Sequence, residues 1–194
     1  AVESNLSVTG QTRDHLSLEK TSNTSTFLLE PITAGRGFHW QKKISISVKG
    51  SLRVMVISES LFIVNEIGLE SYLMSVATSE MSGECPISLL EAQTIAARSW
   101  IIASEEQKHK ELGIDACNDD CCQRYQGTKN ISDSAQLAVN KTRGIFVTYN
   151  DEICDTRYSK SCGGISENNE NVWERTRDES PEALCLPELL SLLY

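Results

Sequence analysis

Residues 68–98 read GLESYLMSVATSEMSGECPISLLEAQTIAAR, and the rest of the chain is organised around them. The spacing of their apolar residues predicts two helices separated by a short break. In the first helix, the residues at helical spacing form one apolar stripe: Leu69, Tyr72, Leu73 and Val76. Glu80 follows Val76 by four residues and therefore extends the same stripe.

A carboxylate at the end of an apolar face has two interpretations. If Glu80 is covered, the loss of hydration disfavours its ionised form and raises its pKa, which suits a general acid that works near neutral pH. If Glu80 turns outward, it is an ordinary helix-end residue in solvent. Helical spacing does not choose between the two.

The second predicted helix begins near Pro86, a residue suited to the first turn of a helix. Gln93 and Arg98 lie inside it, and a buried Arg98 needs a partner, which is either a structural carboxylate or a ligand. The helix has fewer than about eighteen unbroken apolar residues, so it is not a membrane span. Apolar residues cover most of its circumference and predict a central buried helix: Leu89, Leu90, Ala92, Ile95, Ala96, Ala97, Trp100, Ile101 and Ile102.

Strands are predicted before these helices, and a helix and a hairpin after them. Residues 44–48 alternate between apolar and polar, and 52–58 and 61–65 read as two more strands. A third helix is expected over 132–142, capped by Ser132 or Asp133, and a hairpin follows that turns at 150–151. The order of strands, helices and strands predicts an α+β fold, a single domain of antiparallel strands packed around a central buried helix.

Length and charge restrict the class of protein. The 194 residues suit one domain, or one domain with a small appendage. Residues 1–37 begin with a polar stretch and are expected as a lead-in or as weak strands, which leaves 38–194 for the main domain. The net charge of −9 argues against a general nucleic-acid binder, whose surface is basic.

Seven cysteines are many for this length, and their odd number leaves at least one outside any intramolecular disulfide. Cys117, Cys121 and Cys122 lie within six residues, a spacing at which a loop can place several thiolates around one zinc ion. His109 is the nearest candidate for a fourth ligand. The alternative is a disulfide with spare thiols in an oxidising compartment. Either arrangement would be structural.

Nucleophilic catalysis has little support in this sequence. A Cys162 nucleophile would need a histidine to activate it, and none of the three histidines lies in a supporting motif. The G-x-S-x-G pattern of serine hydrolases is absent. Carboxylate chemistry remains, with Glu80 as its candidate.

The sequence carries an ordered set of motifs: YLMSVATSEM, LLEAQTIAARSW, CNDDCCQRYQG, AVNKTRGIFVTYND and YSKSCGGISENNENVW. Together they resemble the stage II sporulation protein D family, which includes the amidase-enhancer domains. The resemblance covers roughly residues 38–173. Cys121 stands where the family usually has histidine in a loop that binds zinc in some members. Glu91 stands where lysine is usual, and the chain ends soon after the last motif.

The resemblance implies roles for particular residues. It aligns Glu80 with the family's catalytic glutamate, which acts as general acid and then as general base. Hydroxyl and aromatic groups bind sugars, and an arginine such as Arg98 can meet the lactyl carboxylate of muramic acid. The expected substrate-binding residues are Gln93, Arg98, Tyr125, Tyr158, Ser159 and Ser161.

The function implied is that of a peptidoglycan lytic transglycosylase, which cleaves glycan strands lacking stem peptides and leaves 1,6-anhydromuramic ends. The alternative is a non-catalytic wall-binding module that recruits or stimulates an N-acetylmuramoyl-L-alanine amidase. Zinc would be structural, and catalysis would need no cofactor. The resemblance implies a bacterial envelope location, periplasmic or extracellular, with a leader removed before the chain begins, because its first residues lack an apolar signal region.

Overall fold

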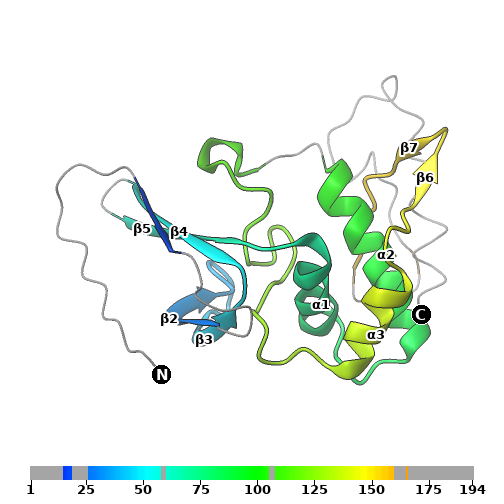
Figure 1. The fold of residues 1–194 in the computed structure, drawn as a ribbon, viewed down its shortest axis with the longest axis horizontal. Coiled ribbons are helices and arrows are strands. Elements are labelled where there is room, and N and C mark those ends of the chain that lie inside the picture. The colour runs from blue at the N-terminus through cyan, green and yellow to red at the C-terminus, as the bar shows by residue number, and fades with distance from the viewer. Residues whose placement is uncertain (1–14, 19–25, 58–59, 105–107, 160–164, 166–194) are drawn as a thin grey trace.

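The computed structural model describes residues 15–18, 26–57, 60–104, 108–159 and 165, and within them it is a mixed α+β fold, as predicted. Figure 1 shows strands β1–β5 at one end of the molecule and the three helices at the other, with the β6–β7 hairpin beside α2. All the paired strands among the described residues are antiparallel.

The strands before the helices form two sheets. One sheet has the order β1-β4-β5, and the other pairs β2 with β3. The predicted strands at 44–48, 52–58 and 61–65 are therefore present as β3, β4 and β5. The bounds are β1 His15–Leu18, β2 Phe27–Ala34, β3 Lys42–Val48, β4 Ser51–Ile57 and β5 Ser60–Glu66.

Strand β2 was not predicted as a distinct strand. Its pairing with β3 shifts register between Leu29 and Ile32, around Pro31. Proline has no N–H for a ladder hydrogen bond and is found in strands at edges and bulges, so it interrupts the regular alternation that identifies a strand in a sequence. The inward residues of β3, Ile46 and Val48, nevertheless form a buried cluster that Phe27, Leu29 and other β2 residues cover.

The three helices are α1 Leu69–Glu80, α2 Ile87–Ala103 and α3 Asp133–Lys141. Helix α2 packs against α1, α3 and β7, which confirms its central position. The Ser132 hydroxyl accepts a hydrogen bond from the Ala135 N–H at 3.1 Å, so Ser132 and not Asp133 is the N-cap of α3.

The buried face of α2 differs from the predicted one. Gln93, Thr94 and Arg98 are fully buried, whereas Ile102 is 49% exposed. Ile102 is one of the apolar residues from which a central buried helix was predicted, and it is exposed although the helix is central. The polar face can point inward because neighbouring elements supply partners to part of it, such as Glu70 to Arg98.

A short hairpin follows α3, with β6 at Thr148–Tyr149 and β7 at Glu152–Ile153. Asn150 and Asp151 have φ of 50° and 67° at the predicted turn, as the favoured two-residue hairpin turns require. Among the described residues no helix combines the length and apolar character needed to cross a membrane.

Candidate functional site

Glu80 is the last residue of α1 and lies half-buried at the edge of the core. Leu73 and Val76, on the same stripe, have no exposed surface and fix this face of the helix against α2 and α3. A Glu80 carboxylate oxygen accepts a hydrogen bond of 2.7 Å from the backbone N–H of Arg124. This contact holds the Glu80 carboxyl group in one orientation.

Two further side chains join α1 to α2 beside Glu80. The Tyr72 hydroxyl donates to Gln123 Oε1 at 3.0 Å, and Gln123 Nε2 donates to the Ala97 carbonyl oxygen at 3.1 Å. The Tyr72 ring also stacks on Tyr125, with 5.5 Å between ring centroids. Tyr72 and Gln123 were not predicted, although Tyr72 lies on the same stripe as Glu80.

Two predicted residues lie close together near this carboxyl group: Gln93 is fully buried, and Tyr158, which is half-buried, lies near both Gln93 and Glu80. The Tyr158 hydroxyl faces the side-chain amides of Gln93 and Gln123, but none of the described residues gives the hydroxyl or the Gln93 amide a hydrogen bond of good geometry. Burial, and then the negative charge of Glu80, raises the pKa of Tyr158 well above its usual value. The hydroxyl therefore stays protonated and can act as a donor.

Arg98 lies apart from this group. Its guanidinium has no exposed surface and donates twice to Glu70, at 3.2 Å from Nε and 2.7 Å from a terminal nitrogen, and once to the Ile145 carbonyl oxygen at 3.2 Å. Glu70 is in the first turn of α1, whereas Glu80 ends the helix about 15 Å further along its axis. The partner that the sequence required is thus a structural carboxylate, and the structure gives no support to substrate binding by Arg98.

Other residues singled out by the sequence have different environments. Tyr125 is buried and its hydroxyl donates to Asn65 Oδ1 at 2.9 Å. Ser159 is exposed, and Ser161 lies outside the described residues. Glu91, which reverses the family's usual charge, pairs with Lys141 of α3 at 3.2 Å.

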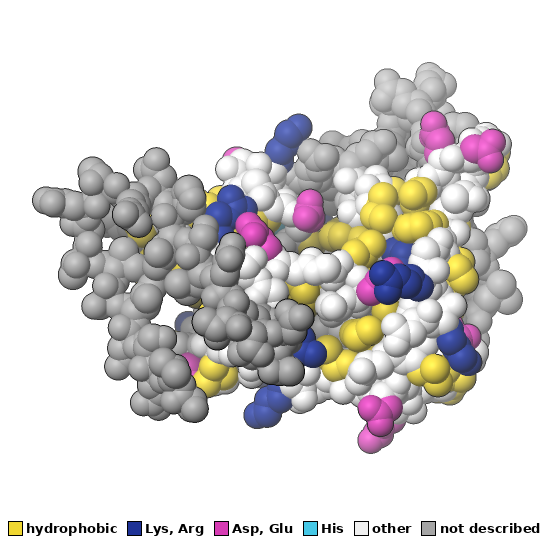
Figure 2. All heavy atoms as spheres, in the orientation of Figure 1, with side chains coloured by type: hydrophobic (Ala, Val, Ile, Leu, Met, Phe, Trp, Pro, Cys, Tyr) yellow, Lys and Arg dark blue, Asp and Glu magenta, His cyan; other side chains and the backbone are white. Residues whose placement is uncertain are grey.

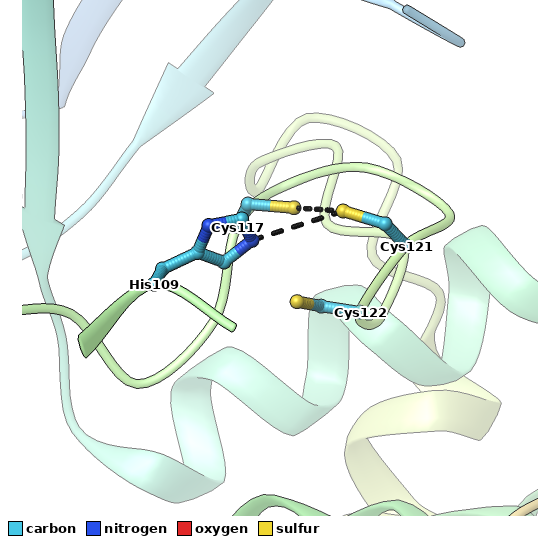
Figure 3. A group of neighbouring side chains, drawn as sticks. All are labelled: His109, Cys117, Cys121 and Cys122. Carbon is cyan, nitrogen blue, oxygen red and sulfur yellow. Dashed lines mark hydrogen bonds between the residues drawn. The ribbon is translucent and has the colours of Figure 1, made fainter. Parts of the chain in front are cut away.

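The four predicted metal ligands meet in one place. Figure 3 shows His109, Cys117, Cys121 and Cys122 pointing toward one another, and their ligand atoms all lie within 4.8 Å. Two sulfurs bound to one zinc ion at about 2.3 Å lie about 3.8 Å apart at the tetrahedral angle. Here Cys121 Sγ is 3.0 Å from Cys117 Sγ and 3.8 Å from His109 Nε2. Three thiols and one imidazole are a donor set that fits tetrahedral zinc.

Cys117, Cys121 and Cys122 are free thiols in the structure. A disulfide bond is about 2.05 Å long, shorter than the separation of Cys117 and Cys121. A hydrogen bond from Cys117 lowers the pKa of Cys122, while burial raises the pKa of Cys121 to about 11. Cys122 is therefore the most acidic of the three thiols, since the pKa values of Cys117 and Cys121 are both raised.

The segment that carries these cysteines also connects the sheets to the helices. The Ser75 hydroxyl of α1 donates to the Gly127 carbonyl oxygen at 2.5 Å, and the Thr128 N–H donates to the Ser47 carbonyl oxygen of β3 at 2.6 Å. Because Gln123 and Arg124 directly follow Cys122, the position of the cysteine cluster determines where the acceptor of the Tyr72 hydroxyl and the donor to Glu80 lie.

Comparison with known proteins places the helical part of the chain in a family. Residues 58–149 match the family described as Stage II sporulation protein, a narrower region than the motifs suggested. An uncharacterized protein of Brachyspira hyodysenteriae is 31% identical over 66% of this chain, and the protein named Amidase enhancer of Bacillus subtilis is 33% identical over 52% of it. The matched regions span only 35% and 13% of those two proteins. Over residues 58–149, this chain therefore carries a domain of the stage II sporulation protein D and amidase-enhancer family.

Proposed function

We propose that this domain has a role in the bacterial cell wall, as a lytic transglycosylase that cleaves peptidoglycan glycan strands with Glu80 as general acid and base. The observation that carries the proposal is the placement of Glu80. It is a half-buried carboxylate oriented by the Arg124 N–H, with the protonated hydroxyl of Tyr158 near it. The family to which the domain belongs supports a role in the cell wall.

The reaction needs one carboxyl group that works twice. Protonated Glu80 gives its proton to the glycosidic oxygen as the bond to the anomeric carbon breaks. The resulting carboxylate then takes the proton of the muramic-acid 6-hydroxyl as that oxygen attacks the same anomeric carbon, which returns Glu80 to its acid form. The Arg124 N–H holds the carboxyl group in place through both steps.

In this proposal zinc is structural. His109 and the three cysteines would hold it, and the ion would cross-link the segment around residue 109 to the loop at 117–122. This cross-link stabilises the backbone that carries Gln123 and Arg124, which contact Tyr72 and Glu80. No proton transfer in the proposed reaction involves the metal.

A second function has its own observation in favour. The Bacillus subtilis relative is named Amidase enhancer, and this chain matches it over 101 residues. A module that binds glycan strands and recruits or stimulates a wall amidase would use the same surface without cleaving the strand.

The decisive experiment compares the wild type with Glu80→Gln on purified glycan strands without stem peptides. The wild type should release fragments with 1,6-anhydro ends, detected by mass spectrometry. Glu80→Gln keeps the shape and loses the proton transfer, so its rate should fall by about 100- to 10,000-fold. The control is Tyr149→Ala, on the remote β6–β7 hairpin, which should retain wild-type activity.

Two outcomes would contradict the proposal. Equal rates for the wild type and Glu80→Gln would show that Glu80 is not the acid. If neither protein forms product while both bind the strands, the recruiting module replaces the enzyme.

A further inference from the structure

The loop between β2 and β3 carries an aromatic cluster that the proposed chemistry does not use. Phe38 and Trp40 stack with 5.7 Å between ring centroids and an interplanar angle of 18°. The Arg124 guanidinium carbon lies 4.8 Å from the centroid of the Trp40 ring, within the range of a cation–π contact. Phe38 remains 48% exposed.

This loop is held against the cysteine segment by backbone contacts. The N–H groups of Gly35 and Arg36 each donate at 2.8 Å to the carboxylate of Asp119, which lies between Cys117 and Cys121. These two hydrogen bonds to one carboxylate fix the start of the loop.

Contacts within the loop between β2 and β3 also fix its conformation. Gly35 has φ of 68°, and a Cβ atom there would overlap the Trp40 ring, so only glycine lets the ring pack closely on the backbone. The Phe38 N–H donates to the Gly35 carbonyl oxygen at 3.0 Å, and the Gln41 N–H donates to the Phe38 carbonyl oxygen at 3.1 Å. Phe38 is thus an exposed ring whose backbone is fixed, and the stack limits its movement toward the core.

The same arginine connects this cluster to Glu80. The backbone N–H of Arg124 donates to the Glu80 carboxylate, and its side chain lies over Trp40. Contacts thus run from Glu80 through Arg124 and Trp40 to the exposed ring of Phe38. A short oligosaccharide bound at Glu80 could extend to this ring.

We propose that Phe38, supported by Trp40 and Arg124, is a stacking subsite for a sugar ring of the strand that binds at Glu80. The apolar C–H face of a pyranose fits an aromatic face, whose negative potential attracts the C–H groups. Because the Phe38 ring is already held in place, it loses little conformational entropy when a sugar binds to it. This inference rests on the proposed glycan substrate. It adds a second binding position on the protein for a sugar of that strand, separate from the position at the Glu80 carboxyl group.

The test measures binding without turnover, in the Glu80→Gln background, by titrating purified peptide-free glycan strands. Phe38→Ala should weaken binding about three- to tenfold, while Phe38→Tyr, which keeps the ring, should bind like the parent. Tyr149→Ala is the matched control, because it removes a partly exposed aromatic ring from the remote β6–β7 hairpin and should leave binding unchanged. Thermal unfolding of each variant checks that the fold is retained.

The outcomes separate this proposal from the one on which it rests. If Phe38→Ala and Phe38→Tyr bind as tightly as the parent, the subsite does not exist, whatever the activity of Glu80. If the parent binds no glycan, the subsite fails as well. If Phe38→Ala alone binds weakly while the wild type makes no anhydro product, the subsite stands and the transglycosylase does not.

Discussion

At the scale of single residues, Arg98 is a buried charge in the central helix α2, and its ion pair with Glu70 of α1 stabilises the fold. We expect Arg98→Ala to lower the free energy of unfolding by about 3–5 kcal/mol, because the change leaves the partly buried Glu70 carboxylate without its partner and opens a cavity among α1, α2 and α3. Denaturant unfolding monitored by circular dichroism measures the loss.

The matched control for Arg98 is the exposed pair Lys141–Glu91, whose side chains are 54% and 29% exposed. Lys141→Ala should cost less than about 1 kcal/mol, because surface ion pairs contribute little. If Arg98→Ala is as stable as Lys141→Ala but binds glycan strands less well than the wild type, Arg98 is a substrate ligand and its assignment here is wrong.

At the scale of elements, the cysteine loop between α2 and α3 joins several parts of the fold. We expect the purified protein to contain about one equivalent of zinc by elemental analysis, and Cys117→Ser to lose most of it, because one of four ligands is weakened. Cys85→Ser is the control, since Cys85 is not among the clustered ligands and its loss should leave the metal content unchanged.

Amide hydrogen exchange would show whether the cysteine loop, when it holds zinc, stabilises the loop between β2 and β3. Chelation should increase exchange at Gly35 and Arg36, whose N–H groups bond to Asp119 between two of the cysteines. A metal-free preparation with a mapped disulfide among Cys117, Cys121 and Cys122 would disprove the zinc site.

At the scale of the whole molecule, buried tyrosines link stability to alkaline pH. Burial raises the pKa of Tyr125 from 10.0 to about 12, so the folded state holds this proton more tightly than the unfolded state. Its stabilising effect is complete below pH 10 and is lost progressively as the pH rises toward 12. The free energy of unfolding should therefore fall over this interval.

Tyr125→Phe tests the assignment. The variant loses the hydrogen bond to Asn65 and should be less stable at neutral pH, but its stability should fall less steeply between pH 10 and 12 than that of the wild type. Parallel pH profiles for the two proteins would show that Tyr125 does not contribute to the alkaline loss.

The sequence by itself determined the helices, several strands, the class of fold and the family. These features could be predicted because each depends on residues that are close in the sequence. The apolar stripe ending at Glu80 predicted α1, Ser132 was one of the two residues expected to cap α3, and the turn at 150–151 predicted the last hairpin. The three clustered cysteines with His109 also came from spacing, because a short loop keeps close ligands together.

Only the tertiary structure decided the contacts between elements that are distant in the chain. It paired Arg98 with Glu70, brought the Arg124 N–H to Glu80, and placed the loop before β3 against Asp119. It also turned the polar side of α2 inward, although the apolar pattern covered most of the helix. The physical reason is that helical periodicity reports where apolar groups recur, whereas the partner of a buried polar group depends on which distant backbone or side chain the fold brings within hydrogen-bond distance.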